Sequence, residues 1–270
     1  MTAEGFAVLG TLPMFPLGTV LVPKAVVPLH VFEPRYQTML ADVMASDRKF
    51  GVVLIERGSE VGGGDVRTDV GTVAQVVELR PIADDRWVVV VAGTERIAVD
   101  RWLSDDPYPR AEVSAFPDEP GLSVNAREWK VLKRRMRQVL AGLVELGDTV
   151  AQATFELGDD PVMGSFQLAG LGPFSDLDRQ RVLCTPGVSG RCALLTELLS
   201  DVAALARLRL GAGEEADGSR GSVVGPWAKG RPSTTWSASS GGTFARRRWN
   251  RCDRWAATSC SAPRGQSWGV

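Results

Sequence analysis

The chain has 270 residues, of which 31 are basic and 32 acidic, and 44% are hydrophobic, a length that allows one large domain or two smaller ones. No apolar run approaches the ~18 residues that cross a bilayer. The first residues also lack the basic start and apolar core of a secretory signal, so we expect a cytoplasmic protein without membrane contact.

Residues 12 to about 116 are predicted to form β-structure. Short apolar runs at 12–17, 19–23 and 26–32 are separated by prolines, which cannot donate to a sheet ladder and therefore favour short or edge strands. Apolar residues at helical spacing predict one helix over 35–46. Further strands are expected at 50–58, 71–82, 86–102 and 111–117, with a hairpin turn at 83–85 between the two long ones. About six strands with one helix indicate a small closed or half-closed β-barrel.

Four helices are predicted after residue 122. Asn125 and Glu128 have the spacing of a capping box that opens a helix ending near Gly147. Asp160 with Pro161 opens a second helix through residue 171, and Ser175 opens a third to about residue 184. The last helix is expected to end at Gly211, and its apolar face contains Cys192, Leu195, Leu198, Leu199, Val202, Leu205 and Leu208.

No catalytic or metal-binding group is expected. His30, the single histidine, alternates with apolar neighbours and has no acid to orient it, so a packed or hydrogen-bonded role is predicted. The glycines of 59–65 are not followed by a helix start, which favours a barrel loop over a phosphate-binding loop. Cys184 and Cys192 lie in apolar helical sequence and are expected to be small buried side chains. We therefore expect no cofactor and no metal.

The segment Phe-Glu-Pro-Arg-Tyr at 32–36 admits two interpretations. In the structural one, Glu33 caps the helix amides and Arg35 pairs with a carboxylate across the barrel. In the functional one, Phe32 and Tyr36 face one side as apolar anchors, with Glu33 and Arg35 at their edge, and together they line a groove for an extended peptide.

These residues also carry a family resemblance. The strings MFPLGTVLVP, VPLHVFEPRY and FGVVLIERGSEVGGG, followed by GTVAQVVELRPIADDRWVVVVAGTERIAV, resemble the N-terminal substrate-binding domain of Lon proteases, in particular its stand-alone bacterial form. The match runs from about residue 12 to 210. It implies an α+β fold, with a PUA-like β-barrel at 10–118 and a helical subdomain at 122–210.

The resemblance implies a non-catalytic module. In Lon this domain binds unfolded substrates and helps to organise the oligomer, whereas the Walker A motif and the Ser-Lys peptidase segment of Lon have no counterpart here. We expect the chain to bind unfolded or extended polypeptide in protein quality control, with a Lon-type protease as a further partner. The alternative is a nucleic-acid-binding PUA-like protein, which the acidic balance of residues 1–210 disfavours.

Residues 211–270 differ in composition from the rest. They hold nine basic and four acidic side chains, against 22 and 28 in residues 1–210, and they contain no Leu or Ile. A segment of this kind cannot build an aliphatic core, so a disordered basic tail is predicted. Because its composition is typical of an unselected frame of a GC-rich gene, we hypothesise a frameshifted or read-through extension; the alternative is a genuine basic arm.

Overall fold

The computed structural model describes residues 7–58, 65–82, 86–121, 123–151, 154 and 156–218. Its strands are β1 (Val8–Leu17), β2 (Val26–Val31), β3 (Lys49–Arg57), β4 (Val66–Ile82), β5 (Arg86–Trp102) and β6 (Arg110–Ala115). Its helices are α1 (Pro34–Met44), α2 (Ala126–Glu145), α3 (Pro161–Leu171), α4 (Asp176–Cys184) and α5 (Val188–Gly218). The predicted hairpin turn at 83–85, the glycine loop at 59–64 and the chain from 219 onward lie outside the described residues.

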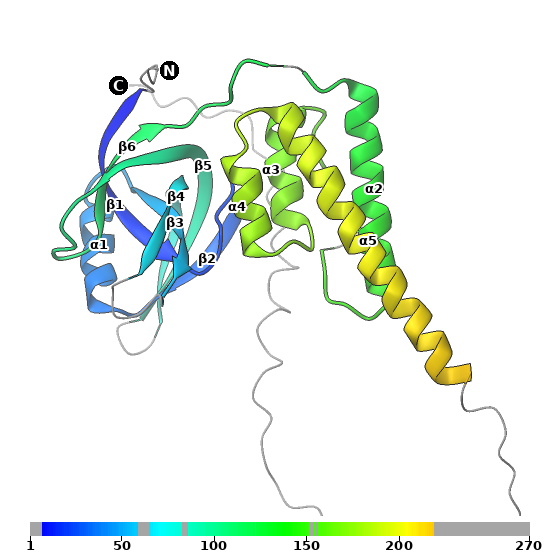
Figure 1. The fold of residues 1–270 in the computed structure, drawn as a ribbon. Helices are drawn as coiled ribbons and strands as arrows, with labels where there is room; N and C mark the ends of the chain where they lie inside the picture. The colour runs from blue at the N-terminus through cyan, green and yellow to red at the C-terminus, as the bar shows by residue number, and fades with distance from the viewer. Residues whose placement is uncertain are drawn as a thin grey trace, which may run out of the picture. The chain divides into compact units, whose positions relative to one another are not determined.

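The strands form one six-stranded sheet in the order β2-β5-β4-β3-β1-β6, and β5 also pairs with β6 (Figure 1). The long strand β5 makes this closure: residues 87–92 pair with β2, and residues 97–102 pair with β6. The strands β5, β4, β3, β1 and β6 therefore form a closed ring, and β2 branches from it with β5 as its one strand partner in the described chain. The α+β class expected from the sequence is confirmed.

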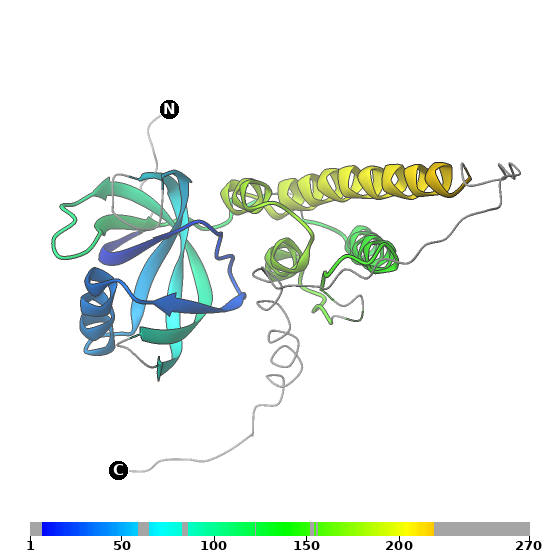
Figure 2. The ribbon, with the colours of Figure 1, turned by 90° about the horizontal axis from the view of Figure 1, so that it is seen from below.

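The barrel interior follows from alternation along the strands. Successive strand residues point to opposite faces, so every second apolar residue enters the core. The helix α1 covers one side of the barrel (Figure 2) and buries there the four apolar residues predicted to share one face, Tyr36, Met39, Leu40 and Val43.

The segment Thr19–Pro23 is not the strand that its apolar sequence predicts. Val20 and Val22 lie outside the strands and pack in the core of the helices, in one hydrophobic cluster with Trp129 and Phe166. The backbone of Val22 passes so close to β5 that a Cβ on Gly93 would lie 2.4 Å from its carbonyl oxygen. Only glycine fits there without a shift of the chain.

The helices begin where the sequence places them. The Asn125 side chain accepts a hydrogen bond from the Glu128 amide at 2.9 Å, and the Glu128 carboxylate accepts one from the Asn125 amide at 3.3 Å, which is the predicted capping box. Asp160 accepts from the amides of residues 162 and 163, and Ser175 accepts from the amide of residue 178. Each cap satisfies donors that the first helical turn leaves unpaired.

The end of α5 differs from its prediction. The helix continues through Gly218 rather than ending at Gly211, because alanines and glutamates follow that glycine and favour helix. Leu205 and Leu208 are exposed rather than buried. Arg209, next to Leu208, pairs with Asp148, which follows the last residue of α2. This part of α5 therefore extends beyond the end of α2, and α2 does not cover the two leucines.

A buried charge network joins β5 to the helices. Asp118 accepts hydrogen bonds from Arg96 at 2.6 Å and, through both oxygens, from Arg191 at 2.6 and 2.7 Å. Arg96 also donates to the carbonyl of Leu183 at 2.8 Å, and both guanidiniums lie over the ring of Phe166. The two arginine side chains are almost fully buried, and the partly exposed Asp118 is the charge partner of both.

The helices in the described part of the chain are too short or too polar to cross a membrane.

Candidate functional site

The two aromatic residues of the segment 32–36 lie in different environments. Phe32 is 53% exposed, whereas Tyr36 is 3% exposed, and the centre of its ring lies 4.3 Å from the centre of the Phe15 ring. Strand β2 ends just before Phe32 and α1 begins at Pro34, so the chain turns between the two rings. The expectation that both rings face one side is wrong: Tyr36 belongs to the core and Phe32 to the surface.

Glu33 and Arg35 pair with each other. The Arg35 Nε donates to the Glu33 carboxylate at 2.9 Å, and the guanidinium lies 4.5 Å from the centre of the Tyr36 ring. Glu33 occupies the N-cap position of α1 but its side chain makes no capping hydrogen bond, contrary to the structural interpretation. The pairing of Arg35 with a carboxylate across the barrel stays a prediction, and the positive charge of Arg35 is one of the causes that lower the pKa of Asp65.

A second arginine that the sequence analysis did not single out completes this corner. Arg67 donates to Asp65 at 2.7 Å and to Asp105 at 2.6 Å, and it lies 4.5 Å above the ring of Trp102. Burial raises the pKa of Asp65, but the hydrogen bond from Arg67, a backbone hydrogen bond and the positive charges of Arg67 and Arg35 together outweigh it, so the pKa falls. The start of α1 and the beginning of β4 therefore share one set of charges around Tyr36.

The buried phenol of Tyr36 gives a titration prediction. Burial raises its pKa to about 12, and Tyr108, the other tyrosine, also has a raised pKa because of burial and its hydrogen bond to Asp42. The folded state therefore favours the neutral phenol. This contribution to stability is complete below the ordinary pKa near 10 and is lost as the pH rises toward 12.

In a pH titration of the folded protein, we expect the ultraviolet absorbance of tyrosinate to appear with a midpoint well above the ordinary tyrosine pKa near 10. Tyr36→Phe should remove the part of this absorbance that appears at the higher pH. A normal midpoint for both tyrosines would contradict the burial of this corner.

Strand β2 offers an open edge that leads to Phe32. One side of β2 pairs with β5, and no backbone group in the described chain pairs with the other side. His30 lies on the outer face of this strand, exposed and without a hydrogen bond to any described residue, so the predicted packed or bonded histidine is wrong. Edge strands present free N–H and C=O groups to which another chain can pair.

The outer face of the sheet beside this edge carries aliphatic side chains. Val26 begins β2 and is 62% exposed, and Val77, in a bulge of β4, is 60% exposed. Val88 and Val90 lie between them on β5, opposite His30 and Pro28 respectively. The sequence did not reveal this surface because a bulge reverses the inside–outside alternation at Val77.

The described residues contain no group of three or more His, Cys, Asp or Glu side chains placed to hold a metal. Cys192 is buried, as predicted, and burial raises the pKa of its thiol to about 11. Cys184 is exposed, contrary to its prediction, because it follows the last buried turn of α4, yet partial burial still raises its pKa. Thiols of this kind stay protonated near neutral pH and are weak nucleophiles.

Comparison with known proteins points to one family. A family model described as the substrate-binding domain of the ATP-dependent protease La (Lon) matches residues 11–201. The Lon protease of Anaeromyxobacter dehalogenans is 29% identical over 202 residues, which cover 70% of this chain, and the Lon protease of Escherichia coli K12 is 27% identical over 194 residues. The chain spans about a quarter of the length of these relatives, 23% and 24% respectively.

Solved structures give the same result. The crystal structure of a Lon N-terminal domain protein from Xanthomonas campestris has a TM-score of 0.53 and 28% identity, and the match covers 71% of this chain and 98% of that one. The N-terminal domain of Lon protease from the Mycobacterium avium complex has a TM-score of 0.51 at 18% identity, over the same shares of the two chains, which supports the fold alone.

Proposed function

This chain belongs to the family of the Lon substrate-binding domain, and from that membership we propose that it is a non-catalytic module that binds extended or unfolded polypeptide. The observation that carries the proposal is the open edge of β2, which ends at the exposed ring of Phe32. An edge supplies backbone hydrogen bonds to any sequence, and an exposed aromatic ring supplies apolar contact area.

In this proposal a client segment adds a strand beside β2. Its backbone pairs with the free groups of the edge, and alternate side chains rest on Val26 at one end and Phe32 at the other. The ion pair of Glu33 and Arg35 limits the site beyond Phe32 and helps to set the register of the client. Tyr36 supports the site from below, as a core residue.

Several finer assignments accompany this proposal. We assign the barrel at 10–118 to the PUA-like type and the residues from 122 to the end of α5 at Gly218 to a helical subdomain, and we propose that neither part requires the basic residues that follow. We place the protein in the cytoplasm, in protein quality control, with a Lon-type protease as a further partner. Support comes from the closed sheet and from the family match, which stops at residue 201.

Replacing Phe32 by alanine tests the site. We expect a fluorescein-labelled neutral peptide of alternating valine and threonine to bind the full chain, and Phe32→Ala to weaken binding by about tenfold or more in fluorescence anisotropy, as loss of an aromatic anchor does. Because the ring is half exposed, the melting temperature should stay nearly unchanged.

Leu177→Ala is the matched control, since Leu177 is an exposed apolar residue on α4, outside the site. Equal affinities of the Phe32→Ala and wild-type proteins would contradict the site. A loss of the same size in the Leu177→Ala protein would indicate non-specific apolar binding.

A further inference from the structure

The helix α2 has a charge opposite to that of the surrounding chain. It contains six basic and two acidic residues, whereas residues 1–210 together hold 22 basic and 28 acidic ones. Arg127, Lys130, Arg134 and Arg137 are exposed and follow one another at intervals of three or four residues, which places them along one side of the helix. The chain therefore presents a basic strip on an acidic body.

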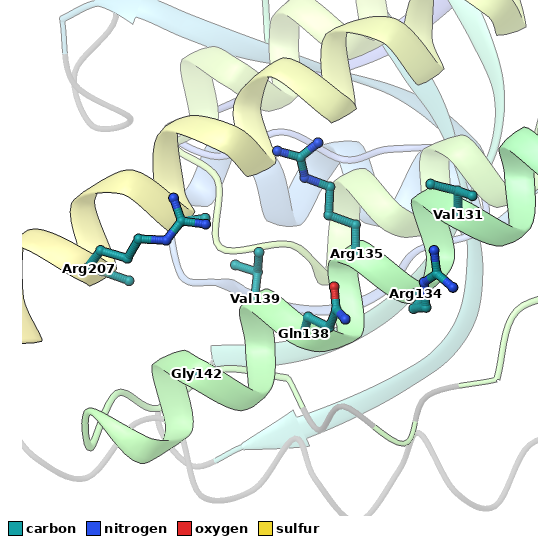
Figure 3. Close-up of a pocket in the computed structure, with 9 residues that line it drawn as sticks. Val131, Arg134, Arg135, Gln138, Val139, Gly142 and Arg207 are labelled. Carbon is teal, nitrogen blue, oxygen red and sulfur yellow. The ribbon is translucent and has the colours of Figure 1, made fainter.

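This strip adjoins a groove between α2 and α5, which pack side by side (Figure 3). The groove has a volume of about 460 Å³. Its floor is apolar and small because Gly142 on α2 faces Ala203 and Ala206 on α5, with Val139 beside them. Side chains of this size leave room between two helices that larger residues would fill.

The rim of the groove is positively charged. Figure 3 shows Arg134 and Arg135 on α2 and Arg207 on α5 around the hollow. Arg135 donates to the neutral hydroxyl of Ser200 at 2.7 Å. Among the described residues no carboxylate pairs with Arg134 or Arg207, so these guanidiniums have no counter-charge in the part of the chain that the structure covers.

A second hollow continues the groove along α2. It has a volume of about 930 Å³ and shares Val131 and Arg134 with the first. Lys133 there pairs with Asp159 at 3.2 Å, and Asp159 is the one acidic side chain among the described residues that line the two hollows. The two hollows form a continuous surface with basic edges and an exposed aliphatic side chain, Val131, where they meet.

We infer that this α2–α5 groove binds an acidic polypeptide segment, with aliphatic side chains on the small-residue floor and carboxylates at Arg134 and Arg207. The inference rests on the proposed function, since it defines a class of client and a second contact surface, separate from the β2 edge. Arginine pairs well with carboxylates, and a helix with one apolar face fits a groove between two helices. Residues 211–270 are excluded as the occupant because they are themselves basic.

The groove is better suited to polypeptide than to nucleic acid. Among the described residues no aromatic side chain lines the α2–α5 groove, and Trp129, at the second hollow, is buried. Single-stranded nucleic acids gain much of their affinity from bases that stack on exposed aromatic rings. The acidic surplus of the remaining body also repels a long polyanion, whereas a short acidic peptide contacts the basic strip alone.

The test compares two labelled peptides on the full chain by fluorescence anisotropy. The acidic probe has leucines at intervals of three and four residues among glutamates, and its control has glutamine in place of every glutamate. We expect the double variant Arg134→Glu, Arg207→Glu to weaken binding of the acidic probe by about tenfold or more, with a loss of affinity for the wild type as salt rises. Arg57→Glu, an equal charge change at the end of β3, should leave binding within about twofold.

The outcomes separate this inference from the proposed function. Binding of the valine–threonine peptide with no binding of the acidic probe overturns the groove and leaves the β2 edge intact. Equal weakening by Arg57→Glu overturns it as well, since attraction is then general. A labelled single-stranded oligonucleotide provides the last outcome. If it binds tightly, the double variant abolishes that binding and the acidic probe does not bind, the groove is assigned to nucleic acid and the inference is overturned. Unchanged melting temperatures of the exposed-site variants exclude unfolding as the cause.

Discussion

Asp118→Ala is expected to lower the free energy of unfolding by about 3–5 kcal/mol, because it leaves buried cations without their partner. Arg96 and Arg191 both donate to this carboxylate, and their side chains are 3% and 0% exposed. Burial lowers the pKa of Arg96 to about 10 although the negative charge of Asp118 raises it, which shows that the carboxylate favours the charged guanidinium. Urea denaturation followed by tryptophan fluorescence measures the loss.

The neighbouring residue provides the control for Asp118. Glu119 is exposed and its side chain makes no hydrogen bond or ion pair with the described residues, so Glu119→Ala should change stability by no more than about 0.5 kcal/mol. Asp118→Asn keeps the hydrogen-bond acceptor but removes the charge and should fall between the two. A loss below about 1 kcal/mol for Asp118→Ala would show that the network does not join β5 to the helices as described.

Tyr36→Ala is the second substitution expected to have a large effect, about 3–5 kcal/mol, as for other large aromatic residues removed from a core. The ring packs against Phe15 and supports the guanidinium of Arg35, so the change opens a cavity and also frees the ion pair at the start of α1. Thermal unfolding should show a clear fall in melting temperature, with peptide binding reduced only as far as the protein unfolds.

Tyr36→Phe separates packing from the hydroxyl group. It keeps the ring and should retain most of the stability at neutral pH. It should also flatten the loss of stability between pH 10 and 12 that the raised pKa of the phenol produces. If Tyr36→Ala leaves the melting temperature unchanged, the ring is not part of the core, and the assignment of Phe32 alone to the surface fails with it.

Local signals in the sequence predicted local structure well. The capping box at Asn125, the Asp160-Pro161 start and the apolar spacing of α1 all depend on residues within one or two helical turns, and the structure contains each of them. The six strands and the α+β class follow from the same kind of pattern. Helix ends were less predictable, since α5 continues past Gly211, whose cost is offset by the alanines and glutamates that follow.

The candidate site, the charge network and the groove depend on contacts between residues that the spacing along the sequence does not predict. Phe32 and Tyr36 are four residues apart, but the turn between β2 and α1 decides that one ring is buried and the other exposed. The partners Arg96, Asp118 and Arg191 come from three distant segments, and no spacing pattern in the sequence links them. The α2–α5 groove likewise requires small residues of two helices to line one hollow, which only the packing reveals.

Hydrogen–deuterium exchange of the full chain, with and without a saturating concentration of the valine–threonine peptide, is the most direct test of whether a client binds as an added strand beside β2. If a client adds a strand beside β2, the amides of Val26–Val31 that face the open edge should exchange more slowly when the peptide is bound. The Phe32→Ala protein should lose this protection at the same peptide concentration. Unchanged exchange in β2 while the peptide is bound, or protection confined to another part of the chain, would contradict the proposed site.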